Sequence, residues 1–341
     1  MIPKTSRQLL LARRPQGEVK DADFELRSVP VRAPEAGEIV VENRYLSIDP
    51  TNRIWMTDAP QYMPPVAIGE VMRGIGVGVV VASKREGIAV GDHVSGMIGW
   101  QEVAVGTPEA LGVQRVEVPQ GMSPTAFLGL LGITGGITAY FGLLDIGAPK
   151  AGETVVVSAA AGSVGSVVGQ IAKIHGCRVI GVAGGPEKCA YVTDELGFDA
   201  CVDYKSADLD KAFAELCPDG VDVYFDNVGG EVLDAVLANL ALHARIVLCG
   251  LISSYNHDAV RGPAHFEQVL MRRARIEGFI ILDYGARYGE AAAAIAGWQR
   301  EGKIRYRETI VEGDITGAPA ALRRLLRGDK IGKLVLALGG A

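Results

Sequence analysis

The sequence has few cysteines, no dense cluster of positive charge and no signal-peptide core. Lys and Arg total 34 against 40 Asp and Glu, a net charge of −6, so a surface that neutralises nucleic-acid phosphates is not expected. The five cysteines are odd in number and include no Cys-x-x-Cys pair, which indicates reduced thiols in a cytosol. The apolar patch at residues 9–12 is too short for a secretion signal. We predict a cytoplasmic protein that binds neither nucleic acid nor a membrane.

Zinc ligands are also scarce in the first half of the chain. No cysteine precedes Cys177, and the only histidines before it are His93 and His175. A zinc-dependent alcohol dehydrogenase needs thiolate and imidazole ligands in its catalytic domain, and four clustered cysteines if it holds a structural zinc. We therefore predict no metal site. Without a Lewis acid to polarise an alcohol or a carbonyl, hydride addition to an electron-poor carbon–carbon double bond is the easier chemistry, so a polarised alkene is the expected substrate.

One uncharged segment, residues 118–144, is long enough to contain a membrane span of about 20 residues. Its glycines, including the pair Gly135-Gly136, would break a continuous helix. Ser123 followed by Pro124 is typical of a helix start. We predict a buried helix through residues 125–131, a turn and a second buried helix at a domain junction.

Two different patterns divide the rest of the chain. A content of 48% hydrophobic and 22% charged residues is globular, and at roughly 150 residues per domain the length predicts two domains. Residues 24–118 carry short Val-rich runs between Pro and Gly, typical of antiparallel strands. From residue 153 onward, apolar strands alternate with helices, which predicts a doubly wound parallel sheet. Residues 304–338 predict a strand, a helix and a strand that return to the first domain.

A dinucleotide-binding fingerprint follows the first strand of the alternating region. The strand TVVVSAA leads into Ala160, Gly162 and Gly165, the G-x-G-x-x-G spacing with alanine in the first place. Gly162 lets the backbone approach a pyrophosphate, and Gly165 lets the helix pack against the strand. An ordinary Gly-rich turn is the alternative, but the position between a strand and an amphipathic helix favours a dinucleotide.

The end of the next strand favours NADP(H) over NAD(H). An NAD site carries a carboxylate there, about 20 residues beyond the fingerprint, on the ribose 2′-hydroxyl. Here the strand CRVIGV ends in Ala183-Gly184-Gly185, and Lys188 follows. A strand end without an acid but with a cation nearby favours a 2′-phosphate. The alternative is that Lys188 is a solvated lysine on a helix face.

Several motifs together resemble the zinc-independent medium-chain dehydrogenase/reductase superfamily. They are the fingerprint segment 159–189, YFDNVGGEVLDAVL at 224–237, CGLISSYN at 249–256, GFII at 278–281 and LRGDKIGKLVL at 326–336. Within that superfamily the chain is similar to the leukotriene B4 12-hydroxydehydrogenase/prostaglandin reductase branch, in particular to bacterial NADPH-dependent curcumin reductases. The resemblance implies a GroES-like substrate and catalytic domain (1–131 and 305–341), a Rossmann NADP(H)-binding domain (132–304) and a homodimer.

The resemblance also implies the residues that hold the cofactor. They are the pyrophosphate turn Gly162, Ser163, Val164 and Gly165, the 2′-phosphate ligands Lys188 and Tyr204, the cofactor-contacting Asn227, the nicotinamide-lining residues Cys249, Gly250, Leu251, Ile252, Ser253, Ser254, Tyr255, Phe279, Ile280 and Ile281, and Lys330, which replaces a family asparagine. For some of them a structural role is the alternative, since Cys249 and Leu251 could belong to the sheet core and Tyr204 could cap a packed strand.

The substrate pocket is predicted at Asn52, Arg53 and Tyr62. The family motif Asp-Pro-Tyr-Met-Arg has the form Asp49-Pro50-Thr51-Asn52-Arg53 here. If the replaced tyrosine touches substrate in relatives, Thr51 leaves a wider and more polar pocket.

The predicted reaction is the NADPH-dependent reduction of an α,β-unsaturated ketone or aldehyde. Hydride adds to the β-carbon, and the resulting enolate is protonated at the α-carbon. Tyr255 is the predicted donor to the developing oxyanion, because it follows the carboxyl end of a Rossmann strand, where such sheets bind ligands. Alternatively, the cofactor's ribose hydroxyl is the donor and Tyr255 packs under the loop. A quinone or nitroalkene oxidoreductase and a non-catalytic NADPH-binding protein remain the alternative functions.

Overall fold

The computed structural model describes residues 1–257 and 262–339. The chain divides into two compact units, of which the first is made of two separate segments of the sequence and the second of one. Unit 1 comprises Met1–Leu128 and Glu308–Ala341, and unit 2 comprises Gly129–Arg307. The domain boundaries predicted from the sequence lie after residue 131 and before residue 305.

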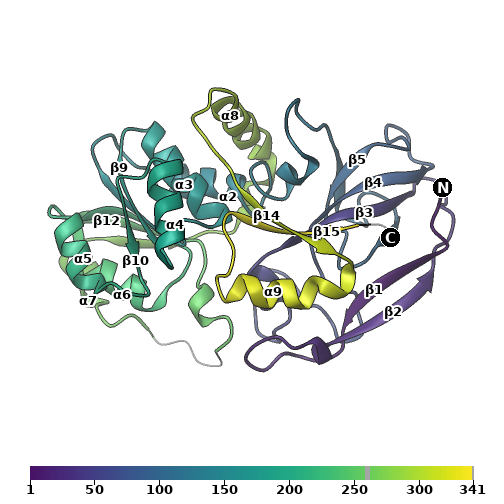
Figure 1. The fold of residues 1–341 in the computed structure, drawn as a ribbon, viewed down its shortest axis with the longest axis horizontal. Helices are drawn as coiled ribbons and strands as arrows, with labels where there is room; N and C mark the ends of the chain where they lie inside the picture. Colours follow the sequence, from purple (N-terminus) through teal and green to yellow (C-terminus); the bar gives the residue numbers. More distant parts are fainter. Residues whose placement is uncertain (258–261, 340–341) are drawn as a thin grey trace. The chain divides into compact units, whose positions relative to one another are not determined.

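Unit 1 is built on a mostly antiparallel sheet, as the alternating runs predict. Its strand order is β14-β15-β3-β4-β5-β7, with β6 on β3, and β1 and β2 form a separate antiparallel ribbon (Figure 1). The core under the sheet contains Ile39, Val41, Val80 and Val94. The strands are β1 Thr5–Leu11, β2 Phe24–Pro30, β3 Ile39–Ile48, β4 Gly76–Ser83, β5 His93–Gly96, β6 Val103–Gly106, β7 Val113–Val116, β14 Glu308–Gly313 and β15 Lys333–Leu338.

The C-terminal segment joins this sheet, which confirms the prediction that it returns to the first domain. Strand β14 pairs in parallel with β15, and β15 pairs antiparallel with β3. Between them, helix α9 (Ala318–Leu326) packs on β15 and β3. Helix α1 (Thr51–Trp55) follows β3, and single helical turns lie at Asp21–Asp23 and Ile315–Gly317.

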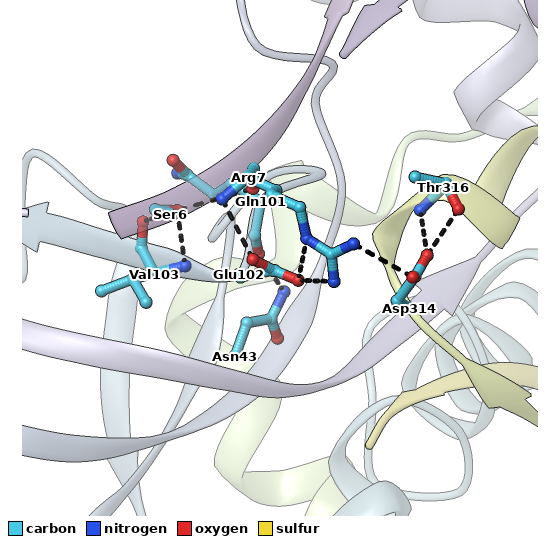
Figure 2. Close-up of polar contacts among 8 residues, drawn as sticks. All are labelled: Ser6, Arg7, Asn43, Gln101, Glu102, Val103, Asp314 and Thr316. Carbon is cyan, nitrogen blue, oxygen red and sulfur yellow. Dashed lines mark hydrogen bonds and ion pairs between the residues drawn. The ribbon is translucent and has the colours of Figure 1, made fainter. Parts of the chain in front are cut away.

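Figure 2 shows how three distant parts of the chain meet in unit 1. The Arg7 side chain donates to Glu102 (Nε to Oε1, 2.9 Å) and to Asp314 (Nη1 to Oδ2, 3.1 Å). The hydroxyl of Ser6 donates to the carbonyl of Val103 at 3.0 Å. Because the charged groups are partly exposed, each ion pair is worth about 0–1 kcal/mol. Their main effect is to hold β1, residue 102 and the C-terminal segment in register.

Unit 2 contains a six-stranded, all-parallel sheet in the order β10-β9-β8-β11-β12-β13. Numbered along the chain this is 3-2-1-4-5-6, the doubly wound dinucleotide-binding order, which reverses between β8 and β11. The predicted strands are confirmed, and β13 is an addition that its charged sequence RIEG did not reveal. The strands are β8 Thr154–Ser158, β9 Arg178–Ala183, β10 Ala200–Asp203, β11 Val221–Asp226, β12 Leu240–Leu248 and β13 Arg275–Gly278.

Helices cover both faces of this sheet (Figure 1). The reversal of strand order puts the crossovers before and after it on opposite faces, since such connections are right-handed. Helix α3 packs on β8 and β9, while Phe213 of α5 and Val236 of α6 share a core with Val156 and Ile180. The helices are α2 Gly136–Phe141, α3 Ser163–Ile174, α4 Pro186–Ala190, α5 Leu209–Leu216, α6 Gly230–Ala238, α7 Glu267–Met271 and α8 Tyr288–Arg300, with shorter or irregular turns at Gly142–Gly147, Tyr191–Glu195, Ile252–Ser254 and Ile281–Arg287.

The uncharged segment 118–144 differs from its prediction in one respect. Ser123 does cap a helix, since its hydroxyl accepts from the Thr125 amide at 3.3 Å, but only Pro124–Phe127 is helical. The predicted helix through residue 131 is wrong, because turns and a bend occupy residues 128–135. The second predicted helix is α2, which runs on into an irregular turn. Within the described residues, no helix is both long and apolar enough to span a bilayer.

Candidate cofactor and active site

The fingerprint turn is tight and leads directly into helix α3. Strand β8 ends at Ser158, Ala159 has a φ of +49°, and the amide of Gly162 donates to the carbonyl of Ala159 at 2.8 Å. Gly162 is the N-cap of α3, so the first amides of a twelve-residue helix point out of the turn. A Cβ on Gly165 would lie 2.4 Å from the Ala159 carbonyl oxygen, so only glycine lets the helix begin this close to the strand.

The residues predicted to hold the 2′-phosphate lie at the carboxyl ends of β9 and β10. The ring of Tyr204 lies over Gly184, where an added Cβ would come within 2.8 Å of it. Tyr204 is nevertheless 47% exposed, so one side of the phenol remains open to a ligand. Lys188 lies on α4, which begins at Pro186 directly after Gly185. The structure therefore brings both predicted phosphate ligands to the same edge of the sheet.

Asp203 is an acid at this edge that the sequence analysis did not consider. Its Oδ1 accepts from the amides of Gly185 (2.7 Å) and Lys205 (3.1 Å), and its Oδ2 accepts from the Ser206 hydroxyl (3.1 Å). These bonds, led by the Gly185 amide, lower the pKa of the carboxyl. Asp203 thus fixes the turn between β9 and α4. It was missed because it ends β10, whereas the NAD signature is an acid at the end of β9.

Asn227 and the loop after β12 lie together at the carboxyl ends of β11 and β12. Asn227 donates through its backbone amide to Ser158 Oγ and through Nδ2 to the Ser158 carbonyl, both at 2.8 Å. The loop is held on the turn before α6, where Ser253 Oγ donates to the Val228 carbonyl at 2.6 Å. The amide of Cys249 donates to the carbonyl of Asp226 at 2.9 Å. Residues predicted to contact the cofactor therefore come from two adjacent strand ends.

Asp226 is the buried hub of this region. Its Oδ1 accepts from Tyr224 Oη, from Ser158 Oγ and from the amides of residues 228 and 229, at 2.8–3.1 Å. Burial raises the pKa of the carboxyl, although these donors oppose the shift. Burial, with Asp226 nearby, also raises the pKa of Cys249 to about 12, so this thiol is protonated and is no nucleophile.

Tyr255 has a defined position at the end of the same loop. Its phenolic oxygen accepts a hydrogen bond from the Leu251 amide at 3.1 Å. A Cβ on Gly250 would lie 3.2 Å from this oxygen, so the hydroxyl rests on the backbone at the end of β12. A phenol that accepts one hydrogen bond can still donate another. The geometry is compatible with a donor role and with a packing role.

Two of the three side chains at residues 279–281 pack into the core of unit 2. The Phe279 ring lies against Gly142 and edge-on to Tyr284, with 6.3 Å between the centroids of the two rings. Ile281 packs against the cluster of Ile137, Phe141 and Ala291. These two side chains serve the core, so a cofactor contact here would use Ile280 or backbone atoms.

The predicted pocket residues of unit 1 differ in exposure. Asn52 is fully buried, where its Oδ1 accepts from the Asp49 amide at 2.8 Å and its Nδ2 donates to the Arg73 carbonyl. Arg53, 4% exposed, donates to the carbonyls of Pro15 and Gly17. Both side chains shape the loop through buried hydrogen bonds, and their predicted contact with substrate stays a prediction.

Tyr62 is the more accessible pocket candidate, at 40% exposure. Its hydroxyl is hydrogen-bonded to that of Thr51 and accepts from Trp55 Nε1 at 2.9 Å. Thr51 is the position predicted to replace a family tyrosine, and the phenol of Tyr62 reaches its side chain. Lys330, which replaces a family asparagine, donates through Nζ to the Gly332 carbonyl at 2.6 Å.

A buried ion pair underlies the loop that carries Thr51. Lys333 Nζ contacts Asp49 Oδ1, and the two side chains are 1% and 6% exposed. The other carboxylate oxygen, Oδ2, accepts from the Ser47 hydroxyl. The C-terminal strand therefore holds the 49–53 loop in place. As for metals, in residues 1–257 and 262–339 no three His, Cys, Asp or Glu side chains are grouped so that they could hold an ion.

Comparison with known proteins identifies the family. A model described as the N-terminal domain of oxidoreductase matches residues 7–113, and one described as zinc-binding dehydrogenase matches residues 163–297. The chain is 46% identical over 341 residues to the NADPH-dependent curcumin reductase of Escherichia coli (strain K12), covering 98% of this chain and 97% of that protein. The chain belongs to the zinc-independent medium-chain dehydrogenases/reductases.

Other members of this reductase family agree with the assignment. The NADP(+)-dependent 2-alkenal reductase of Nicotiana tabacum is 38% identical and covers 97% of each chain. The crystal structure of CurA from Vibrio vulnificus in complex with NADPH is 45% identical and has a TM-score of 0.92, covering 98% of this chain and 100% of that one. The predicted family and the predicted fold, a GroES-like β domain with a Rossmann domain, are confirmed.

Proposed function

We propose that this reductase uses NADPH to reduce the carbon–carbon double bond of α,β-unsaturated ketones and aldehydes. It is an NADP-dependent oxidoreductase of the 2-alkenal reductase type. The observation that carries the proposal is the near full-length identity, 46% and 38%, to two enzymes named as NADPH-dependent curcumin reductase and NADP(+)-dependent 2-alkenal reductase. The substrate is a small electron-poor alkene.

The residues of unit 2 fit NADP(H). The space kept free by Gly165 and the amides at the start of α3 suit a pyrophosphate. Ala183 and Gly184 leave no carboxylate side chain at the end of β9, and Lys188 and Tyr204 stand beside that end. When bound, NADPH supplies the hydride that adds to the β-carbon of the alkene.

Residues of the chain orient the nicotinamide end and the substrate, and they stabilise the charge that develops on the substrate oxygen. Asn227 and the loop Cys249–Tyr255 hold the nicotinamide end, and Ile280 with backbone atoms of 279–281 completes that wall. Tyr255 donates a hydrogen bond to the substrate oxygen as charge develops on it. The Leu251 amide on the Tyr255 oxygen polarises the phenol and strengthens it as a donor. The Thr51–Tyr62 hydroxyl pair gives the substrate pocket its polar wall.

The enzyme acts as a cytoplasmic homodimer. Five free cysteines suit a reducing compartment. Strand β13 lies at the edge of the unit 2 sheet, and near it the exposed side chains of Phe266, Leu270 and Met271 offer apolar surface for a second copy. A concentration series in analytical ultracentrifugation tests the dimer, and a monomer at micromolar concentration would exclude it.

One experiment separates this function from its competitors. NADPH and NADH oxidation is followed at the absorbance band of the reduced nicotinamide ring, with a panel of enones, enals, quinones and nitroalkenes. We expect turnover of enones and enals with a clear preference for NADPH. Faster turnover of quinones or nitroalkenes would reassign the substrate, and tight NADPH binding without turnover of any acceptor would indicate a binding protein.

A further inference from the structure

Tyr306, which the sequence analysis did not single out, lies at the fingerprint turn. Its hydroxyl is 3.2 Å from that of Ser163, the first residue of α3, although the two residues are 143 positions apart. Ser163 belongs to the predicted pyrophosphate turn, so a phenol from the far end of unit 2 reaches the position where the phosphates are expected.

Two features fix Tyr306 there. Gln170, 3% exposed on α3, clamps the preceding residue: its Nε2 donates to the Arg305 carbonyl at 2.9 Å, and its Oε1 accepts from the Arg305 amide at 2.7 Å. The Tyr306 hydroxyl also packs tightly against Gly129, because a Cβ on Gly129 would lie 1.8 Å from Tyr306 Oη. The segment is therefore held on α3 by two hydrogen bonds between the Gln170 side chain and the Arg305 backbone, and not by the phenol alone.

Glycines in the backbone beside Ser163 allow the Tyr306 hydroxyl to come this close. A Cβ on Gly135 would lie 2.0 Å from the Gly129 carbonyl oxygen and 3.0 Å from Ser163 Oγ. Both glycines thus leave room for two hydroxyls at the start of one helix. Paired hydroxyls beside helical amides form a donor set suited to the oxygens of a pyrophosphate.

We infer that Tyr306 is a ligand of the cofactor pyrophosphate and that its hydroxyl donates a hydrogen bond to a phosphate oxygen next to Ser163. This inference rests on the proposed NADPH-dependent function and adds a residue to its cofactor site. A hydrogen bond to a charged group is worth about 1.5–3 kcal/mol, which corresponds to about a tenfold to hundredfold change in affinity.

The test uses three ligands that share the 2′-phosphate end. NADPH and 2′-phospho-ADP-ribose both contain the pyrophosphate, whereas 2′-AMP lacks it. Dissociation constants are measured by calorimetry on the full-length protein carrying Tyr306→Phe. We expect the Kd of the first two ligands to rise by similar factors, about tenfold or more, and the Kd of 2′-AMP to change less than twofold.

Tyr191→Phe is the matched control. It also removes a phenolic hydroxyl from unit 2, one that is buried and has no hydrogen-bond partner within the described residues. We expect it to leave all three constants unchanged, with thermal melts confirming that both variants fold. Ser163→Ala together with Tyr306→Phe is expected to be non-additive, because both hydroxyls serve one phosphate.

Equal weakening of all three ligands by Tyr306→Phe, or no weakening of any, would overturn the inference and leave Tyr306 a packing residue. A wild-type protein that binds none of the ligands would overturn both this inference and the proposed function. The expected binding pattern without turnover of any enone would support the inference and refute the proposed reaction alone.

Discussion

The phenolic oxygen of Tyr255 accepts a hydrogen bond from the backbone amide of Leu251, four residues earlier, at 3.1 Å. This bond fixes the hydroxyl at the carboxyl end of β12, the edge at which doubly wound sheets bind ligands. It also sets what a substitution of Tyr255 removes. Removing the hydroxyl leaves the Leu251 amide without this acceptor but leaves the ring in place.

Tyr255→Phe is expected to lower kcat/KM for an enone by tenfold or more, because the oxyanion loses a preorganised donor. The Kd for NADPH should stay within about threefold of the wild-type value, since the loop keeps its other bonds to residues 226–228. Steady-state kinetics on an enone series measure the effect. A loss smaller than about threefold, under 1 kcal/mol, would remove Tyr255 from the mechanism.

Lys188→Ala is expected to raise the Kd for NADPH by about tenfold or more and to leave the Kd for NADH nearly unchanged, because only NADPH carries the 2′-phosphate. Tyr204→Phe should act in the same direction with a smaller effect. Fluorescence titration with both coenzymes measures it. The control is Lys211→Ala, an exposed lysine of α5 whose side chain is 73% accessible. Equal weakening of NADH binding and NADPH binding would show that Lys188 stabilises the structure and does not bind the 2′-phosphate.

Gly165→Ala is expected to abolish measurable NADPH binding. The added methyl group would lie 2.4 Å from the Ala159 carbonyl oxygen, and backbone cannot move aside as a flexible side chain can. The matched control is Gly297→Ala in α8, where an added Cβ meets no atom within 4 Å. Calorimetric titration with NADPH and a thermal melt of both variants decide the outcome, and normal binding by Gly165→Ala would contradict the proposed pyrophosphate turn.

Asp226 is expected to make stability fall as pH rises. Burial raises the pKa of this carboxyl above its usual value of 3.8, so the folded protein holds the proton more tightly than the unfolded chain does. The stabilisation is fully present below 3.8 and is lost as pH rises through the folded-state pKa. The free energy of unfolding of the wild type, relative to Asp226→Asn, should therefore decrease from acid pH upward and then level off.

Urea denaturation at a series of pH values measures this difference. Tyr224→Phe is the control, because it removes one donor to the carboxyl and keeps the titrating group, so its pH trend should resemble that of the wild type. A wild-type stability that rises relative to Asp226→Asn with increasing pH would show that the donors on Oδ1 outweigh burial.

Breaking the pair Lys333–Asp49 is expected to be costly. Lys333→Met leaves the Asp49 carboxylate buried without its cation, which typically costs about 3–5 kcal/mol, whereas Lys333→Met with Asp49→Asn should cost less than the single change. Denaturant unfolding measures both. Lys211→Met, which breaks an exposed pair with Glu215, should cost under about 1 kcal/mol. Similar costs for Lys333→Met and Lys211→Met would contradict the assigned burial.

The sequence predicted the repeating parts of the fold well and the irregular parts less well. The alternation of apolar strands with helices, the spacing from Ala160 to Gly165 and the acid-free end of β9 are all patterns of consecutive residues. Strand β13 escaped notice because an edge strand need not be apolar on both faces. The helix predicted through residue 131 ends at Phe127, and the turns that follow include Gly129, where an added Cβ would lie 1.8 Å from Tyr306 Oη, a contact that no local pattern shows.

By itself the sequence determined the order of the elements, the cofactor fingerprint and the family, because local propensity and motif spacing reside in neighbouring residues. Only the tertiary structure decided that Asp203 ties down the β9–α4 turn, that Asp226 gathers donors from β8, β11 and the start of α6, and that Tyr306 meets Ser163. These contacts join residues that are far apart along the chain or close only through a turn. Their geometry depends on how the sheet and its helices pack, which no local pattern encodes.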